Sequence, residues 1–152
     1  MPCHDDGEGL DRSPAERPRY FEGQLLTAED LRDEQDYWVR KHRLQNLALH
    51  GSGVVCGLAV TQQGRGAVTV APGIAIDGLG REIVVPEPVE LRAGRRGGEV
   101  VLRYQEEPSR WSVDGEATRI REGFEVSIGR RGEATDPDGI VLANLERPTR
   151  GD

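Results

Sequence analysis

One continuous stretch decides the fold of this chain: residues 19–85 read RYFEGQLLTAEDLRDEQDYWVRKHRLQNLALHGSGVVCGLAVTQQGRGAVTVAPGIAIDGLGREIVV. Its first half has helical periodicity, and its second half has the period of two that is typical of strands, interrupted by Gly and Pro turns. The stretch contains no nucleophile beside a base, no acid–base pair and no metal-ligand spacing. It therefore predicts a part that presents a rigid surface for assembly or binding, in preference to an enzyme.

The helix is predicted to begin at Thr27, whose hydroxyl suits an N-cap. Asp30 lies three positions later and completes an aspartate version of the capping box, where the helix dipole also favours negative charge. Three apolar residues precede the cap and are expected to fold over the first turn as a staple: Phe21, Leu25 and Leu26.

The predicted helix runs from Ala28 to about Leu49, with apolar and aromatic residues recurring near one face. Gly51 and Gly53 follow it, and either can adopt the left-handed conformation that ends a helix. We expect the apolar face to dock either onto the protein's own sheet or onto a neighbouring subunit.

From residue 54 onward, short apolar runs between turns predict strands. Pro72–Gly73 is expected to force a corner, because proline fixes its φ and glycine supplies the unusual one. We predict loops at 105–116 and 129–139. The fold class is α+β and mainly β, a long N-terminal helix followed by a small antiparallel β-sandwich or open barrel. The predicted strands are 54–60, 67–71, 74–76, 81–85, 89–91, 99–104, 124–128 and 140–145.

Composition and charge narrow the classes of function. The 152 residues carry a net charge of −7, which opposes binding to nucleic acid, and no apolar run is long enough for direct membrane insertion. Residues 1–18 are predicted to form a flexible acidic N-terminal arm, and 19–152 a single helix-plus-β assembly domain. The N-terminus has no secretory signal, so we expect cytoplasmic synthesis.

Few residues are candidates for binding a metal ion or for catalysis. Cys3, His4, His50 and Cys56 include the residue types that bind zinc, but they lack a paired spacing. An isolated cysteine is more often a buried small apolar group, and His42 and His50 are expected to pair with the carbonyls at the helix end. We predict no metal, no cofactor and no catalytic residue.

Several short blocks of sequence occur together over about residues 20–124. They are 20–26 (YFEGQLL), 30–31 and 34–35 in the helix, 49–58 (LHGSGVVCGL), 70–77 (VAPGIAID), 80–83 (GREI), 102–106 (LRYQE) and 118–124 (TRIREGF). Together they resemble small proteins associated with phage-tail-like contractile injection systems. The Leu-His-Gly block and the Pro-Gly-x-Ala-Ile-Asp block are moderately specific in combination and weak alone.

The resemblance implies a structural component of a tail-like particle, at the baseplate or as a fibre attachment. Its partners would be other tail or baseplate subunits, in a particle that is cytosolic or released, and a homo-oligomer, a trimer by analogy, is expected. The alternative is an adhesin-like or carbohydrate-binding tail module, for which Trp111 and Tyr104 are the candidate residues.

Two sets of residues are predicted to make the binding surface. The first set is the interface candidates, four aromatic residues before and within the helix: Tyr20, Phe21, Tyr37 and Trp38. They are chosen because aromatics concentrate binding energy at buried interface centres, and the alternative is that they serve the protein's own core. The second set is the residues predicted to fix backbone corners: Gly51, Gly53, Pro72, Gly73, Asp77, Gly80 and Arg81.

Overall fold

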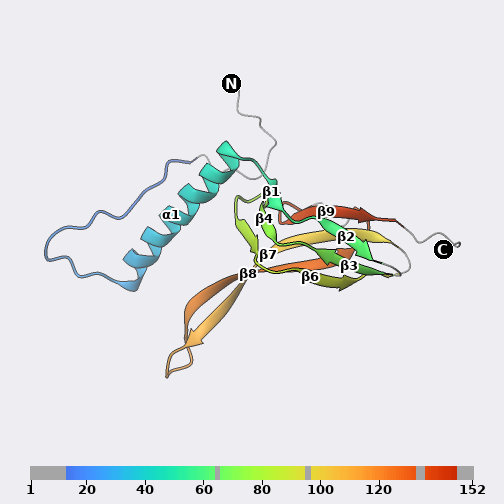
Figure 1. The fold of residues 1–152 in the computed structure, drawn as a ribbon. Helices are drawn as coiled ribbons and strands as arrows, with labels where there is room; N and C mark the ends of the chain where they lie inside the picture. Colours follow the sequence, from blue (N-terminus) through green and yellow to red (C-terminus); the bar gives the residue numbers. More distant parts are fainter. Residues whose placement is uncertain (1–12, 64–65, 95–96, 133–135, 147–152) are drawn as a thin grey trace, which may run out of the picture.

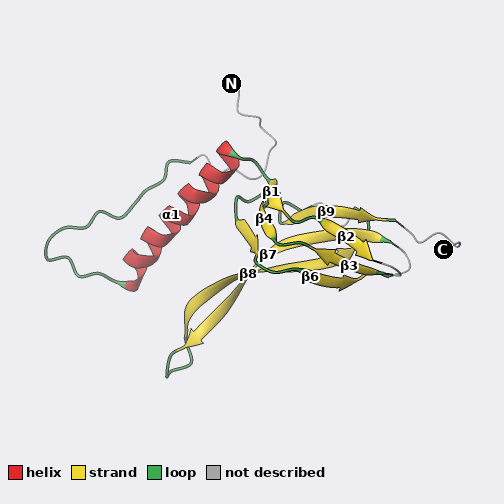
Figure 2. Cartoon of the chain, viewed as in Figure 1, coloured by secondary structure: helices red, strands yellow, loops and turns green. Residues whose placement is uncertain are grey.

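The computed structural model describes residues 13–63, 66–94, 97–132 and 136–146. Within these ranges, a single helix precedes nine strands arranged in three small antiparallel sheets, and the sheets do not close into a barrel. The predicted fold class is confirmed. Figure 2 shows the helix standing beside a body made of strands.

Helix α1 (Ala28–Leu49) has the bounds that the sequence predicts. The first six strands form two three-stranded sheets with the orders β1-β4-β5 and β2-β3-β6, and the last three form a sheet with the order β8-β7-β9. The strands are β1 (Gly53–Gly57), β2 (Val60–Gln63), β3 (Ala67–Val70), β4 (Gly73–Ile76), β5 (Glu82–Val85), β6 (Val89–Arg92), β7 (Gly98–Trp111), β8 (Ala117–Gly129) and β9 (Gly139–Leu145).

The first six strands form a meander of three longer strands, each bent into two: β1 with β2, β3 with β4, and β5 with β6. On one side of the bend β4 pairs with β1 and β5, and on the other side β3 pairs with β2 and β6. Gly57, the last residue of β1, and Leu58 both have positive φ (67° and 56°) and turn the chain before β2, so the predicted strand 54–60 is two strands. Pairing continues across the bend, because the amide of Leu58 donates to the carbonyl oxygen of Pro72 at 3.1 Å.

A corner is present at Pro72–Gly73, but glycine is needed at position 73 for a different reason from the predicted one. The left-handed φ belongs to Gly57 across the sheet, and Gly73 begins β4 without one. Glycine is required at position 73 by close approach, since a Cβ there would lie 2.3 Å from the carbonyl oxygen of Cys56 and 2.5 Å from the amide nitrogen of Leu58.

The predicted loop at 105–116 is wrong over most of its length. β7 and β8 pair continuously from Glu99 opposite Gly129 to Trp111 opposite Ala117, which leaves only residues 112–116 as the turn. Beyond Arg103, β7 pairs with β8 alone, and a proline such as Pro108 is tolerated in an edge strand. The outer part of this hairpin, residues 105–123, projects from the body and is called the arm (Figure 1).

The core lies between the bent meander and the β8-β7-β9 sheet. Inward-facing residues alternate with outward-facing ones along β3 and β5, as expected for strands with one buried face. Tyr104 and Phe124 are partly buried against this core at the base of the arm. The buried core residues are Leu58, Val68, Val70, Ala75, Ile83, Val85, Val100, Leu102, Ile140 and Leu145.

Candidate functional site

Helix α1 stands largely clear of the body that follows it (Figure 1). Asn46 is the one buried residue among its 22. Large apolar side chains on the helix are exposed to solvent, with Trp38 at 59%, Leu31 at 51% and Leu49 at 68% of their full accessible surface. A helix in water normally gains most of its stability by packing such a face, and the described residues leave this one largely uncovered.

The helix is joined to the body near its C-terminal end. The side-chain amide of Asn46 donates a 3.0 Å hydrogen bond to the carbonyl oxygen of Gly80. Gly80 has a φ of +79°, and a Cβ there would lie 2.4 Å from the carbonyl oxygen of Arg43. The turn between β4 and β5 therefore approaches the helix backbone too closely for any residue but glycine.

That turn is held rigid by a buried carboxylate. Asp77 is fully buried and accepts hydrogen bonds from the amides of Leu79 and Arg81, each at 2.9 Å, and from Nε of Arg81 at 2.6 Å. Arg81 also donates to Asp138 at 2.5 Å and lies 4.8 Å from the ring centre of Tyr104. Residues 77–81 thus connect α1 to both the base of the arm and the loop before β9.

The end of α1 uses the predicted glycines. Gly51 has a φ of +70°, and its amide donates to the carbonyl oxygen of Leu47 at 3.1 Å. Gly53 has a φ of +138° and opens β1. Backbone conformation alone requires glycine at these two positions, since a Cβ at either would meet no atom within 4 Å.

The start of α1 is fixed by the predicted capping box. The amide of Asp30 donates to the Thr27 hydroxyl at 3.2 Å, and the Thr27 amide donates to the Asp30 carboxylate at 2.8 Å. The side-chain hydrogen bond from Thr27, and then the backbone one, lower the pKa of Asp30. The predicted staple is absent, because Phe21 and Leu25 remain 71% and 85% exposed.

The segment before the helix returns along it. The Tyr20 hydroxyl donates to Glu34 at 2.9 Å, and Arg40 donates to both the carbonyl and the hydroxyl of Ser13 at 2.7 Å. Desolvation, followed by the hydrogen bond to Glu34 and nearby negative charge, raises the pKa of Tyr20. Residues 1–12 of the predicted acidic arm lie outside the described residues.

A groove of about 970 Å³ lies between α1 and the arm, and is called the helix–arm groove. The helix wall contains Leu31, Gln35, Val39 and Arg43 at successive intervals of four, so these residues share one face. Arg43 and Glu106 approach to 4.0 Å and connect the two walls at the inner end. The described residues that line the groove are Leu31, Glu34, Gln35, Asp36, Trp38, Val39, Arg43, Glu106, Ile120 and Glu122.

Negative charge surrounds the apolar part of the groove. Among the described residues, its lining contains four acidic side chains and one basic side chain, Arg43. Glu106 and Glu122 are direct cross-strand partners on the arm, an arrangement of like charges that destabilises a hairpin. Burial, then a hydrogen bond to Glu106 and the charge of Glu122, raise the pKa of neighbouring Tyr104.

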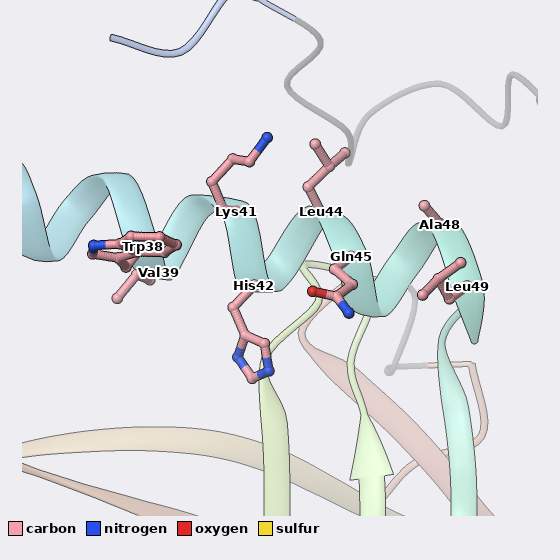
Figure 3. Close-up of a pocket in the computed structure, with 8 residues that line it drawn as sticks. All are labelled: Trp38, Val39, Lys41, His42, Leu44, Gln45, Ala48 and Leu49. Atoms are coloured by element: carbon pink, nitrogen blue, oxygen red, sulfur yellow. The ribbon is translucent and has the colours of Figure 1, made fainter. Parts of the chain in front are cut away.

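A second hollow, of about 780 Å³, runs along the C-terminal half of α1. All of the described residues that line it come from the helix itself, so within the described part of the chain it is a surface of α1 alone. Figure 3 shows His42 pointing toward the strands, whereas Lys41 and Leu44 point away from them. Trp38 and Val39 line both this hollow and the helix–arm groove.

The four predicted interface aromatics do not serve the core between the sheets, as far as the described residues show. Trp38 lines the groove, and the half-buried Tyr37 packs edge-to-face against it with ring centres 5.2 Å apart. Tyr20 and Phe21 lie outside the groove, 40% and 71% exposed. The structure therefore places only one of the four in the groove.

The residues considered for other chemistry are dispersed. Tyr104 is packed under Arg81 instead of lying exposed in a loop, while Trp111 is 65% exposed on the arm. His42 faces Glu82 at 3.5 Å instead of a helix carbonyl, and the expected burial of Cys56 is wrong, because it is exposed. Cys3 and His4 lie outside the described residues, within which no three His, Cys, Asp or Glu side chains gather as metal ligands do.

The sequence did not predict the wall formed by the arm. Glu106 falls in the segment predicted as a loop, and Glu122 precedes the strand predicted at 124–128. The alternation of Arg119, Ile120 and Arg121 does indicate a strand with one charged face, but it does not reveal that this strand pairs with residues 107–109.

No protein-family model matches this chain. No curated protein matches it in sequence. Among solved structures, the crystal structure of TssK is similar, with a TM-score of 0.48 and 13% sequence identity; the match covers 87% of this chain and 37% of the TssK chain. At this identity and TM-score, the similarity assigns neither a family nor a function to the chain. Among the described residues, no helix combines the length and apolar character that a membrane span requires.

Proposed function

We propose that this protein is a non-enzymatic structural subunit of a contractile injection system or related phage-tail-like particle, at the baseplate or a fibre attachment. It assembles through α1, whose exposed apolar face is the observation that carries the proposal. The resemblance of segments such as 49–58 and 70–77 to proteins of these particles supplies the biological setting.

The energetics of α1 favour burial by another subunit. Fully burying a large apolar side chain is worth about 1.5–3 kcal/mol. Leu31, Trp38 and Leu49 each leave half or more of that surface in water. Contiguous exposed apolar surface with a polar rim is typical of protein–protein contacts, and a tryptophan is a common centre of such contacts.

The body supplies a rigid support for this surface. The buried Asp77–Arg81 pair fixes the turn, Gly80 allows the turn to touch the helix, and Asn46 joins the two. Because these contacts all lie at one end, the remaining turns of α1 stay available to a neighbouring subunit.

The test is affinity purification of the tagged full-length chain from its native host, with the recovered proteins identified by mass spectrometry. We expect sheath, tube or baseplate proteins to be recovered, and a large loss of them for Trp38→Ala. Trp111→Ala is the matched control, because Trp111 is similarly exposed but lies on the arm away from the groove lining. Recovery of the bait alone, when intact particles are present, would contradict the proposal.

A carbohydrate-binding tail module is the second candidate. Trp111, 65% exposed near the end of the arm, favours it, since sugar rings stack on exposed aromatic faces. A glycan-binding screen of the full chain, with Trp111→Ala as the comparison, separates this candidate from the first.

A further inference from the structure

We propose that the helix–arm groove binds a cationic amphipathic helix of a partner subunit, with apolar residues on one face and Lys or Arg beside them. This inference rests on the proposed function, because it names the chemistry of one partner of that subunit. The groove belongs to this chain alone and needs no second copy to complete its walls.

The size of the groove suits a short helical segment. The groove measures about 970 Å³ and is open to solvent, so the side chains on one face of a short helix can enter it. Leu31, Trp38 and Val39 present apolar surface from one wall, and Ile120, 69% exposed, presents it from the other. An incoming helix would meet these with residues spaced three and four apart.

The charge of the groove selects a basic partner. Glu34, Asp36, Glu106 and Glu122 give four negative charges against the single positive charge of Arg43, a net charge of −3 for the lining. Glu106 and Glu122 repel each other directly across the arm, and Arg43, 4.0 Å from Glu106, offsets only part of that negative charge. A lysine or arginine side chain from a partner would relieve that repulsion and could donate hydrogen bonds to both carboxylates.

The two nearest alternative occupants fit less well. Residues 1–12 contain four acidic residues and one arginine, so their negative charge would be repelled. Helix α1 of a second copy carries five acidic and four basic residues, and therefore offers no net positive charge. Charge complementarity favours a different, basic segment.

The experiment uses the full chain with Trp111→Phe, so that Trp38 is the one tryptophan remaining. The probe is a synthetic helical peptide with Leu on one face and Lys flanking it, and the control peptide has Glu in place of every Lys. We expect a blue shift of Trp38 fluorescence with the Lys peptide, tighter binding of it than of the Glu peptide, and weaker binding at higher salt.

Paired variants locate the site. Glu106→Gln with Glu122→Gln should weaken the Lys peptide roughly fivefold, the scale of losing two partly exposed charge pairs. The control is Glu107→Gln with Glu116→Gln, which removes two arm charges outside the groove lining and should leave affinity unchanged. The test variant loses both the repulsion between the two carboxylates and the contact of Glu106 with Arg43, so its melting temperature should stay close to that of the parent.

Equal binding of the two peptides would overturn the inference, as would equal effects of the two variant pairs. Self-association would also overturn it, in favour of a second copy as the occupant. The signs would be a dimer in analytical ultracentrifugation, a blue-shifted Trp38 fluorescence without peptide, and no binding of the peptide. These outcomes are distinguishable from failure of the proposed function, because particle proteins recovered with the tagged chain report on that function whatever the peptide does.

Discussion

The side-chain amide of Asn46 lies 3.0 Å from the carbonyl oxygen of Gly80 and joins the exposed helix to the body of the protein. The one buried residue of α1 thus makes its contact with a turn that a buried carboxylate holds in place. Because this junction is small, the direction of the helix depends on a few residues at one end.

Replacing Asn46 with Leu should loosen that junction. The carbonyl of Gly80 would lose its partner in a buried position, at a cost of about 1–3 kcal/mol. We expect a lower melting temperature and faster amide hydrogen exchange in the last turns of α1. Gln45→Leu at an exposed neighbouring position is the control, and equal exchange in the two variants would show that Asn46 does not fix the helix.

Gly73→Val should prevent correct folding. A Cβ at position 73 would lie within 2.5 Å of backbone atoms of Cys56 and Leu58, which cannot move without breaking the bend between the two sheets. We expect insoluble protein or loss of the cooperative unfolding transition. The control is Gly94→Val, because a Cβ there meets nothing within 4 Å. A Gly73→Val protein that folds and assembles normally would refute this account of the corner.

Asp77→Ala should be strongly destabilising. The substitution leaves Arg81 without its buried partner and two amides without an acceptor, and breaking a buried pair typically costs about 3–5 kcal/mol. Urea unfolding measures the loss. Asp114→Ala in the exposed turn of the arm should change stability by less than about 0.5 kcal/mol, and similar losses for the two variants would contradict the role given to Asp77.

The start of α1 should depend on pH in the acid range. Its capping bonds lower the pKa of Asp30 in the folded protein, so the ionised carboxylate stabilises the helix end above the ordinary value of 3.8. This contribution is lost as the pH falls through the lowered pKa. NMR titration of the Thr27 amide should report fraying there, Asp30→Asn should remove the dependence, and an unchanged titration in that variant would assign it to another group.

The helix could be predicted to its end residues because its signals are local. Thr27 and Asp30 form a reciprocal cap, and Gly51 takes the left-handed conformation just beyond the last turn. The direction in which α1 points could not be predicted, since the apolar periodicity around Trp38 is the same whether the face packs on the protein's own sheet or on another chain.

The strands of the meander were predicted well, and the arm poorly, for a physical reason. Val68 and Ile83 belong to short apolar runs with one buried face, which gives a clear period of two. Residues 105–111 have no core beneath them and include Pro108, so their strand conformation comes from pairing with partner residues 6–18 positions away. The groove could not be predicted for the same reason, because it depends on where the arm projects.

The most direct test of the central claim is photo-crosslinking in intact particles, with benzoylphenylalanine in place of Trp38. If α1 is buried by a neighbouring subunit, irradiation should yield a covalent adduct between position 38 and a particle protein, identifiable by mass spectrometry. The same label at Trp111, which is exposed on the arm, should give a different pattern of adducts. Particles that contain the labelled chain yet give no intermolecular adduct from position 38 would contradict the account.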